Sequence, residues 1–165
     1  GPHAFSAFTA SVLQLRPESV GHLKLVSANA DDHPEIHPNY LATETDQNTI
    51  VKGIQIARKI AQFEPLKAHV TEEYQPGHEV GMDDYDATLN WARNTAVTIY
   101  HPTGTCKMGS DPMAVVDHRL RVHGLQGLRV ADASIMPVIT SGNTNAPSIM
   151  IGEKVSDMIL EDAVL

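Results

Sequence analysis

Two polar residues near the C-terminal end of the chain have side chains suited to acid–base chemistry. His101 precedes Pro102 in a turn rich in Thr and Gly, and Asn143 follows Gly142. A neutral imidazole can take a proton near physiological pH and serve as a general base. An asparagine amide can hold and orient a substrate oxygen, but it cannot act as a base. By themselves both residues are ambiguous, because a His before Pro is commonly structural and Gly-Asn is ordinary turn chemistry.

A carboxylate and the start of a helix accompany these two residues. Residues 128–131 predict a short strand that places Asp132 at its end, where the carboxylate could equally cap a turn. A helix is predicted next, because Asn145 can cap it and Pro147 lies in its first turn, where a missing N–H costs little. Gly152 in this helix suggests that another backbone approaches closely. The predicted buried stripe of the helix is Ile151, Val155, Met158 and Ile159.

The strands expected to position these groups are short. Residues 8–15 are rich in β-formers, and residues 22–27 alternate between apolar and polar side chains. We expect these two strands to pair as antiparallel neighbours. Residues 29–40 predict a loop because they contain two prolines and adjacent aspartates. Two further strands are predicted at residues 66–70 and 119–122.

Two more helices are predicted upstream of His101. The first is capped by Thr45 or Asp46 and ends near Phe63. The second follows Asp83-Asp84, since carboxylates in a first turn favour the positive end of a helix. The predicted fold class is therefore α+β, an antiparallel sheet flanked by helices.

Composition excludes several classes of function. The 165 residues carry a net charge of −8, which argues against non-specific nucleic-acid binding. No apolar run is long enough to span a membrane, and no basic-then-apolar signal pattern begins the chain. The single Cys106 excludes an internal disulfide and favours a reducing compartment, so we expect a cytoplasmic location. The nine histidines lack metal-ligand spacing, because prolines follow His33 and His37, and we expect no metal site.

The order of the C-terminal motifs resembles one enzyme family. The motifs are Tyr-His-Pro-Thr-Gly-Thr-Cys-Lys-Met-Gly (100–109), Val-Asp (116–117), Arg-Val-His-Gly (121–124), Gly-Leu-Arg-Val-Ala-Asp-Ala-Ser (127–134) and Gly-Asn-Thr-Asn-Ala-Pro-Ser (142–148). Together they resemble the C-terminal region of the glucose-methanol-choline (GMC) flavoprotein oxidoreductases. Residues 15–19, 38–41 and 57–60 resemble the substrate-binding region of the same family. The His-then-Asn pattern is most similar to the choline dehydrogenase and alcohol dehydrogenase branch.

The resemblance implies oxidation of a primary alcohol to an aldehyde, with hydride transfer to FAD. It makes His101 the base and Asn143 the group that orients the substrate oxygen, and it implies that the two side chains converge beside the reactive carbon. A helix start beside the flavin would stabilise the negative charge of the reduced ring. The residues implied to line the cofactor are Asp132, Ala133, Thr144 and Asn145.

The resemblance also implies a division of labour. Residues 1–99 would form the substrate-binding region, and residues 100–165 would carry the catalytic motif and the C-terminal strand and helix that complete the FAD domain. The chain has no Gly-x-Gly-x-x-Gly loop for the FAD pyrophosphate. We therefore expect a fragment of the enzyme, or one of two chains, that needs an N-terminal FAD-binding domain and takes a small alcohol.

Alone, such a chain should bind FAD weakly, be inactive and self-associate. A non-catalytic binding or assembly module and a flavin-containing lyase of the same family remain open as alternatives. The sequence leaves open which alcohol is used, and whether oxygen, a quinone or another molecule accepts the electrons.

Overall fold

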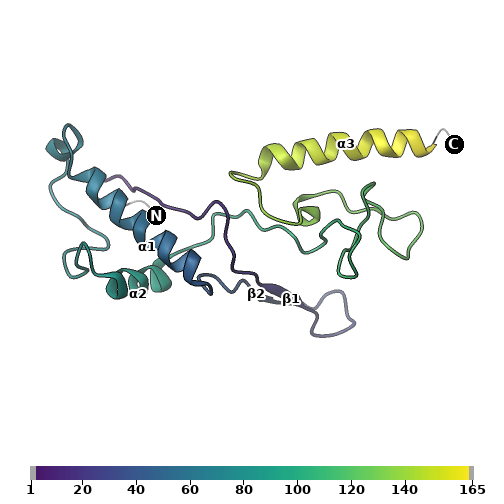
Figure 1. The fold of residues 1–165 in the computed structure, drawn as a ribbon, viewed down its shortest axis with the longest axis horizontal. Coiled ribbons are helices and arrows are strands. Elements are labelled where there is room, and N and C mark those ends of the chain that lie inside the picture. The colour runs from purple at the N-terminus through teal and green to yellow at the C-terminus, as the bar shows by residue number, and fades with distance from the viewer. Residues whose placement is uncertain (1–2, 164–165) are drawn as a thin grey trace. The chain divides into compact units, whose positions relative to one another are not determined.

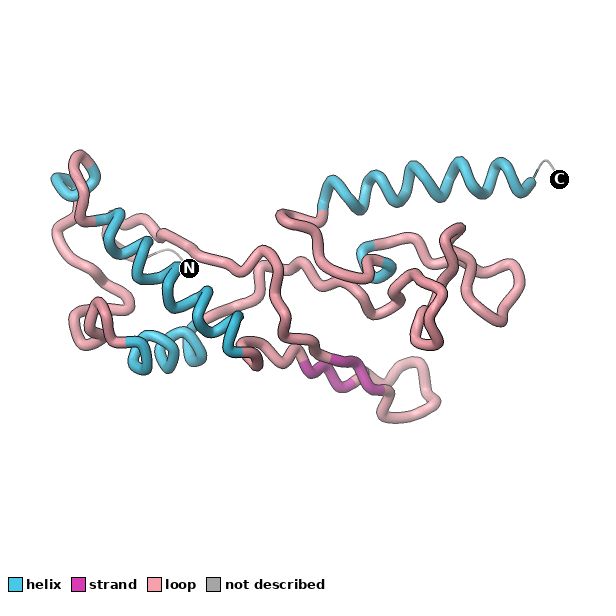
Figure 2. Tube along the Cα trace, in the orientation of Figure 1, coloured by secondary structure: helices cyan, strands magenta, loops and turns pink. Residues whose placement is uncertain are grey.

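The computed structural model describes residues 3–163, which form two compact units (Figure 1). The first unit comprises the chain up to Val20 and residues 39–97, and the second comprises residues 21–38 and the chain from Thr98 onward. Within the described residues, three α-helices accompany one two-stranded antiparallel sheet, which confirms the predicted α+β class. Much of the remaining chain is loop (Figure 2).

Two helices form the core of the first unit. α1 (Glu44–Ala61) packs against α2 (Tyr85–Thr95), and each buries an apolar stripe. α2 begins directly after Asp84 as predicted, and Asp84 caps it, because its carboxylate accepts a hydrogen bond from the N–H of Ala87 at 2.9 Å. The cap of α1 is Thr43 rather than the predicted Thr45 or Asp46. The buried apolar residues of the two helices are Val51, Ile54, Leu89 and Ala92.

Two strands predicted in this unit are absent. Residues 8–15 form no strand, and part of this segment approaches α1 instead. A Cβ on Gly53 would lie only 3.2 Å from the Cβ of Val12, which shows how closely this segment approaches the helix. Leu66–His69 forms a short 3-10 helix, η1, where residues 66–70 predicted a strand. Its N–H groups bond to local acceptors, as in the hydrogen bonds from Lys67 to the carbonyl oxygen of Phe63 at 3.0 Å and from Ala68 to that of Pro65 at 3.3 Å.

The sheet is a hairpin in the second unit. β1 (His22–Lys24) pairs antiparallel with β2 (Glu35–His37), so the predicted strand at 22–27 is confirmed in its first half. Its predicted partner is wrong, because β2 comes from the stretch predicted as a loop. The rings of His22 and His37 stack across the strands with centroids 4.5 Å apart. Gly21 permits the pairing, since a Cβ there would lie 2.1 Å from the carbonyl oxygen of His37.

The remainder of the second unit surrounds an apolar cluster beside α3 (Asn145–Ala163) and the short 3-10 helix η2 (Ala133–Ile135). Neither predicted strand at 119–122 or 128–131 forms; only isolated bridges do, between Val116 and Val122 and between Arg121 and Arg129. The backbone of Leu120 has φ of 62°, and this left-handed conformation interrupts an extended strand. The buried members of the cluster are Val116, Leu120, Ile135, Met136, Ile151 and Val155.

α3 is predicted correctly in position and only partly in packing. Ile151 and Val155 are buried, but Met158 is half-buried and Ile159 is 48% exposed. A Cβ on Gly152 would meet no described atom within 4 Å, so the close approach expected there is absent from the described part of the chain. No helix within residues 3–163 has the length and apolar character needed to cross a membrane.

Arginines anchor the last turn of α3. Arg119 donates to Asp162 at 2.9 Å and to the carbonyl oxygen of Met158 at 3.1 Å, and Arg129 donates to the other carboxylate oxygen of Asp162. The hydrogen bond from Arg129, together with the charge of Arg119, holds the pKa of Asp162 below its ordinary value. Positive side chains at this end also complement the negative end of the helix dipole.

A buried carboxylate ties the N-terminal segment to the start of α1. Asp46 is 2% exposed and accepts hydrogen bonds from the N–H groups of Glu18 at 3.0 Å and Ser19 at 2.8 Å. In return the Ser19 hydroxyl accepts from the N–H groups of Ala42 and Thr43. Burial alone would raise the pKa of the Asp46 carboxyl, but the hydrogen bonds from Ser19 and Glu18 lower it below the ordinary 3.8.

We expect Asp46→Asn to lower the free energy of unfolding at neutral pH by about 2 kcal/mol, because hydrogen bonds to a charged acceptor are lost. Since the folded pKa is depressed, the contribution is complete above the ordinary value of 3.8 and is lost as the pH falls through the lower folded value. Urea unfolding across this range measures the effect, with the exposed Asp83→Asn as control. A gap between parent and Asp46→Asn that stays constant into the acid range would contradict this account.

We expect Thr88→Val to raise the free energy of unfolding by about 1 kcal/mol. The Thr88 side chain is 0% exposed, and its hydroxyl has no hydrogen-bond partner among the described residues. Valine has a similar shape and a similar helix propensity, and it removes the unsatisfied group. The control is Thr49→Val, whose exposed hydroxyl donates to the carbonyl oxygen of Thr45 at 2.8 Å and should give no gain. Equal effects of the two substitutions would overturn the prediction.

Candidate active site

A sharp turn presents His101 from the loop that opens the C-terminal part of the second unit. The backbone of Tyr100 has φ of 62°, a left-handed conformation that costs about 1 kcal/mol for a non-glycine residue. The hydroxyl of Thr98 supports the turn by accepting from the N–H of Tyr100 at 3.1 Å. The side chain of Tyr100 is exposed as a result, and that of His101 is half-buried.

Backbone hydrogen bonds hold the segment after His101 against η2. The N–H of Cys106 donates to the carbonyl oxygen of Ser134 at 3.0 Å, and the N–H of Met108 donates to that of Ile135 at 2.8 Å. Because Ile135 belongs to the apolar cluster, these bonds attach the His101 loop to the core of its unit.

A second turn presents Asn143 immediately before α3. Gly142 has φ of 154°, which a side chain would strain, so a glycine suits this position. Thr144 follows and is 7% exposed. Its carbonyl oxygen accepts from both the N–H of Ser148 at 3.0 Å and the Ser148 hydroxyl at 2.7 Å. Thr144 therefore stands where Asn145 was predicted to cap, and the helix fixes its backbone.

The two turns meet at the imidazole ring of His101. The Nδ2 of Asn143 lies 2.9 Å from Nε2, and the hydroxyl of Thr144 lies 2.9 Å from Nδ1. The backbone nitrogen of Thr144 is 3.5 Å from the same Nδ1. The expected convergence of His101 and Asn143 is thus confirmed, although their catalytic roles stay predictions. Asn143, beside Nε2, is exposed, whereas Thr144, beside Nδ1, is buried.

The predicted flavin-lining residues lie at the starts of two elements in contact, with Asp132 and Ala133 at η2 and Thr144 and Asn145 at α3. The carboxylate of Asp132 is exposed and accepts from the N–H of Ser134 at 2.7 Å, so it caps η2. Ala133 is partly buried against the apolar cluster, and Asn145 is the exposed first residue of α3. The hydroxyl of Thr144 faces His101. A role for these four residues in binding a cofactor stays a prediction.

Sequence reasoning missed the contact between Thr144 and His101. Thr144 was singled out only as a flavin-lining residue, whereas its side chain reaches the ring nitrogen opposite Asn143. The sequence did offer one indication of this contact, because Thr144 directly follows Asn143. A residue next to one that contacts the ring must also lie near the ring.

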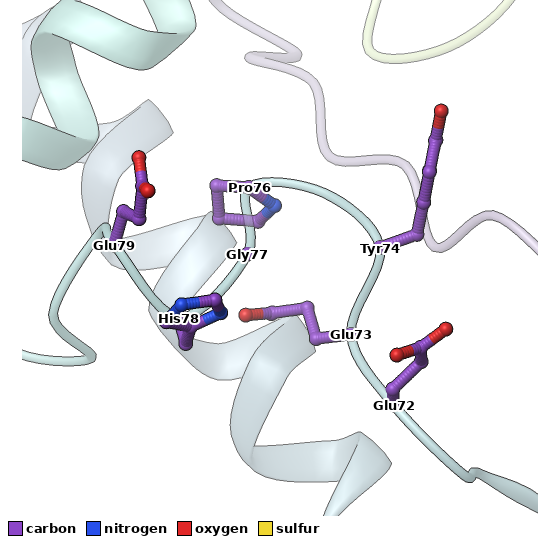
Figure 3. Close-up of a pocket in the computed structure, with 7 residues that line it drawn as sticks. All are labelled: Glu72, Glu73, Tyr74, Pro76, Gly77, His78 and Glu79. Carbon is purple, nitrogen blue, oxygen red and sulfur yellow. The ribbon is translucent and has the colours of Figure 1, made fainter.

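A separate cavity of about 350 Å³ lies in the first unit and carries no comparable chemistry. One exposed loop, residues 72–79, forms all of its lining (Figure 3). Glu73 in this loop is already paired with Arg58 at 2.7 Å. No group of three His, Cys, Asp or Glu able to hold a metal occurs between residues 3 and 163. The His101 junction is therefore the site that we carry forward.

Comparison with known sequences gives a consistent family. The family model described as GMC oxidoreductase matches residues 17–152. The chain is 48% identical to the mitochondrial choline dehydrogenase of Mus musculus over 161 residues, which cover 96% of this chain and 26% of that protein. It is 46% identical to the alcohol dehydrogenase [acceptor] of Pseudomonas putida over 153 residues, covering 93% of this chain and 27% of that protein.

Solved structures give the same result. A formate oxidase variant from Aspergillus oryzae matches with a TM-score of 0.83 and 32% identity, over 90% of this chain and 26% of that chain. The pyridoxine 4-oxidase from Mesorbium loti matches with a TM-score of 0.80 and 32% identity, over 87% of this chain and 28% of that chain. The chain thus spans about a quarter of the length of the proteins that it matches.

Proposed function

Because the chain belongs to the GMC oxidoreductase family, we propose that it is the C-terminal, substrate-facing part of an FAD-dependent enzyme that oxidises a primary alcohol to an aldehyde. The observation that carries the proposal is the 2.9 Å contact between the amide of the exposed Asn143 and Nε2 of His101. This contact places a base and a group that can orient a hydroxyl next to each other.

His101 and Asn143 would divide the work on the alcohol. The hydroxyl proton passes to Nε2 of His101, which contributes a rate factor of about 10²–10⁴ as a general base. The amide of Asn143 holds the hydroxyl oxygen so that the proton faces Nε2. FAD, when bound, would supply the acceptor for the hydride of the alcohol carbon, so that loss of the proton and the hydride leaves the aldehyde.

The start of α3 has the chemistry that the flavin requires. The first helical bond runs from Ser148 to Thr144, so the N–H groups of Asn145 and Ala146 precede it and have no acceptor within the helix. Both residues are exposed. Free N–H groups at the positive end of a helix favour the negative charge of a reduced flavin ring. In this proposal Asn145 and the neighbouring Thr144, together with Asp132 and Ala133, would hold the flavin.

The uncovered apolar surface supports an N-terminal FAD-binding domain as the partner. Along α3, Ile149 is 60% and Leu160 is 66% exposed, on a helix whose opposite stripe is buried. On the hairpin, Leu25 is 80% and Ile36 is 67% exposed. Large apolar side chains in this number require cover, and self-association is expected when the partner is absent.

The same geometry favours catalysis over a non-catalytic module, and an experiment separates the dehydrogenase from a lyase. A non-catalytic module has no need of the contact between Asn143 and His101. A lyase could use the same imidazole without net oxidation, and turnover that depends on an added electron acceptor separates the dehydrogenase from it. The names of the two relatives, a choline dehydrogenase and an alcohol dehydrogenase, support an alcohol as substrate. A cytoplasmic location also stays a proposal.

We expect His101→Ala, in the enzyme loaded with FAD, to slow flavin reduction by the alcohol by about 10²–10⁴-fold, because the proton loses its acceptor. The FAD content should stay near that of the parent. Anaerobic stopped-flow absorbance measures the rate. The control is His118→Ala, an exposed histidine of the same unit. Reduction at the parental rate in His101→Ala would remove this residue from the mechanism.

We expect the purified 165-residue chain to retain little FAD, because the loop that binds the pyrophosphate is expected in the partner. After incubation with FAD and desalting, the flavin absorbance per chain should be far below one equivalent. Addition of the FAD-binding domain should restore it. A chain that is yellow by itself, with one FAD bound, would show that it does not depend on the partner.

A further inference from the structure

The ring of His101 has a neighbour at each nitrogen, and these neighbours compete to decide where its proton resides. Asn143 places an N–H donor 2.9 Å from Nε2, which calls for a lone pair on Nε2. The backbone N–H of Thr144 lies 3.5 Å from Nδ1 and calls for a lone pair there. A neutral imidazole carries a proton on one of its two nitrogens, so only one nitrogen can offer a lone pair to a donor. The Thr144 hydroxyl, 2.9 Å from Nδ1, can either donate or accept.

The distances favour a proton on Nδ1. A donor at 2.9 Å makes a normal hydrogen bond, whereas 3.5 Å is at the limit of one. With the proton on Nδ1, the hydroxyl of Thr144 accepts it and Nε2 keeps its lone pair toward Asn143. With the proton on Nε2, the lone pair would point at the buried Thr144, where no substrate can reach it.

We propose that Thr144 is a positioning residue, whose hydroxyl accepts the hydrogen bond from Nδ1–H of His101 and thereby keeps the lone pair on Nε2, the nitrogen beside the exposed Asn143. The importance of that lone pair for oxidation rests on the proposed function, whereas the placement of the proton does not.

The surroundings of Thr144 make it a rigid acceptor. Its side chain is 7% exposed, and its carbonyl oxygen is held by two hydrogen bonds from Ser148 at the start of α3. The hydroxyl therefore sits at a fixed place relative to the helix. When Nε2 takes the proton of the alcohol, the Asn143 N–H turns from Nε2 to the alcohol oxygen, whereas Nδ1 keeps its own proton and its bond to Thr144 persists through the transfer.

The test compares Thr144→Val with Thr144→Ser in the FAD-loaded enzyme. Valine keeps the branched shape and removes the acceptor, while the backbone N–H stays and then favours a lone pair on Nδ1. Serine keeps the hydroxyl. The matched control is Thr88→Val, a buried threonine whose hydroxyl has no partner among the described residues. One readout is the ¹⁵N NMR spectrum of labelled histidine rings, assigned with His101→Ala, because protonated and unprotonated ring nitrogens have distinct shifts.

We expect the parent, Thr144→Ser and Thr88→Val to show His101 protonated at Nδ1, and Thr144→Val to show the proton moved to Nε2. Flavin reduction should fall roughly tenfold in Thr144→Val alone, the effect of one neutral hydrogen bond, with KM for the alcohol unchanged. Nε2–H in the parent, or equal losses in Thr144→Val and Thr144→Ser, would overturn the proposal. The NMR spectrum tests the position of the proton independently of activity. Unchanged flavin reduction in His101→Ala would refute the proposed function and not the position of the proton.

Discussion

One imidazole ring joins two segments that are 42 positions apart in the chain. Its Nδ1 meets the buried hydroxyl of Thr144 and its Nε2 meets the amide of Asn143, both at 2.9 Å. Because Asn143 and Thr144 are adjacent, the segment at the start of α3 contacts both nitrogens of the ring. The packing of the second unit holds the His101 loop and α3 in place, because a shift between them would break both contacts.

The junction is held by a core rather than by a sheet. The loop after His101 bonds to η2 through Cys106 and Met108, and η2 in turn contacts α3. Ile135 of η2 and Ile151 of α3 are both buried in the apolar cluster. The loops are irregular in φ and ψ, yet their ends are attached to packed elements. Such loops can aim side chains with little freedom, which an active site requires.

The sequence predicted what depends on local pattern. α2 and α3 follow from their period and from starts marked by Asp84 and Pro147, and the family motifs pointed to His101 and Asn143. The strands were mostly predicted wrongly, because a strand depends on a partner that is distant in sequence. Residues 8–15 approach α1 and do not pair with a strand. The left-handed backbone of Leu120 interrupts the strand predicted at residues 119–122. The contact from Thr144 to His101 depends on how two turns meet, which no local pattern encodes.

In the proposed enzyme, the contacts that orient the base are separate from those that would hold the cofactor. The contacts that set the ring of His101 all lie within one unit, so they need nothing from another polypeptide. The helix start, by contrast, presents N–H groups without helical acceptors, and the exposed Ile149 lies one turn further along the same helix. A partner that covers this end of α3 would place its ligand against those N–H groups. In the proposed enzyme the flavin is thereby brought to a base whose orientation is already set, so docking the partner aligns the hydride acceptor without disturbing the proton acceptor.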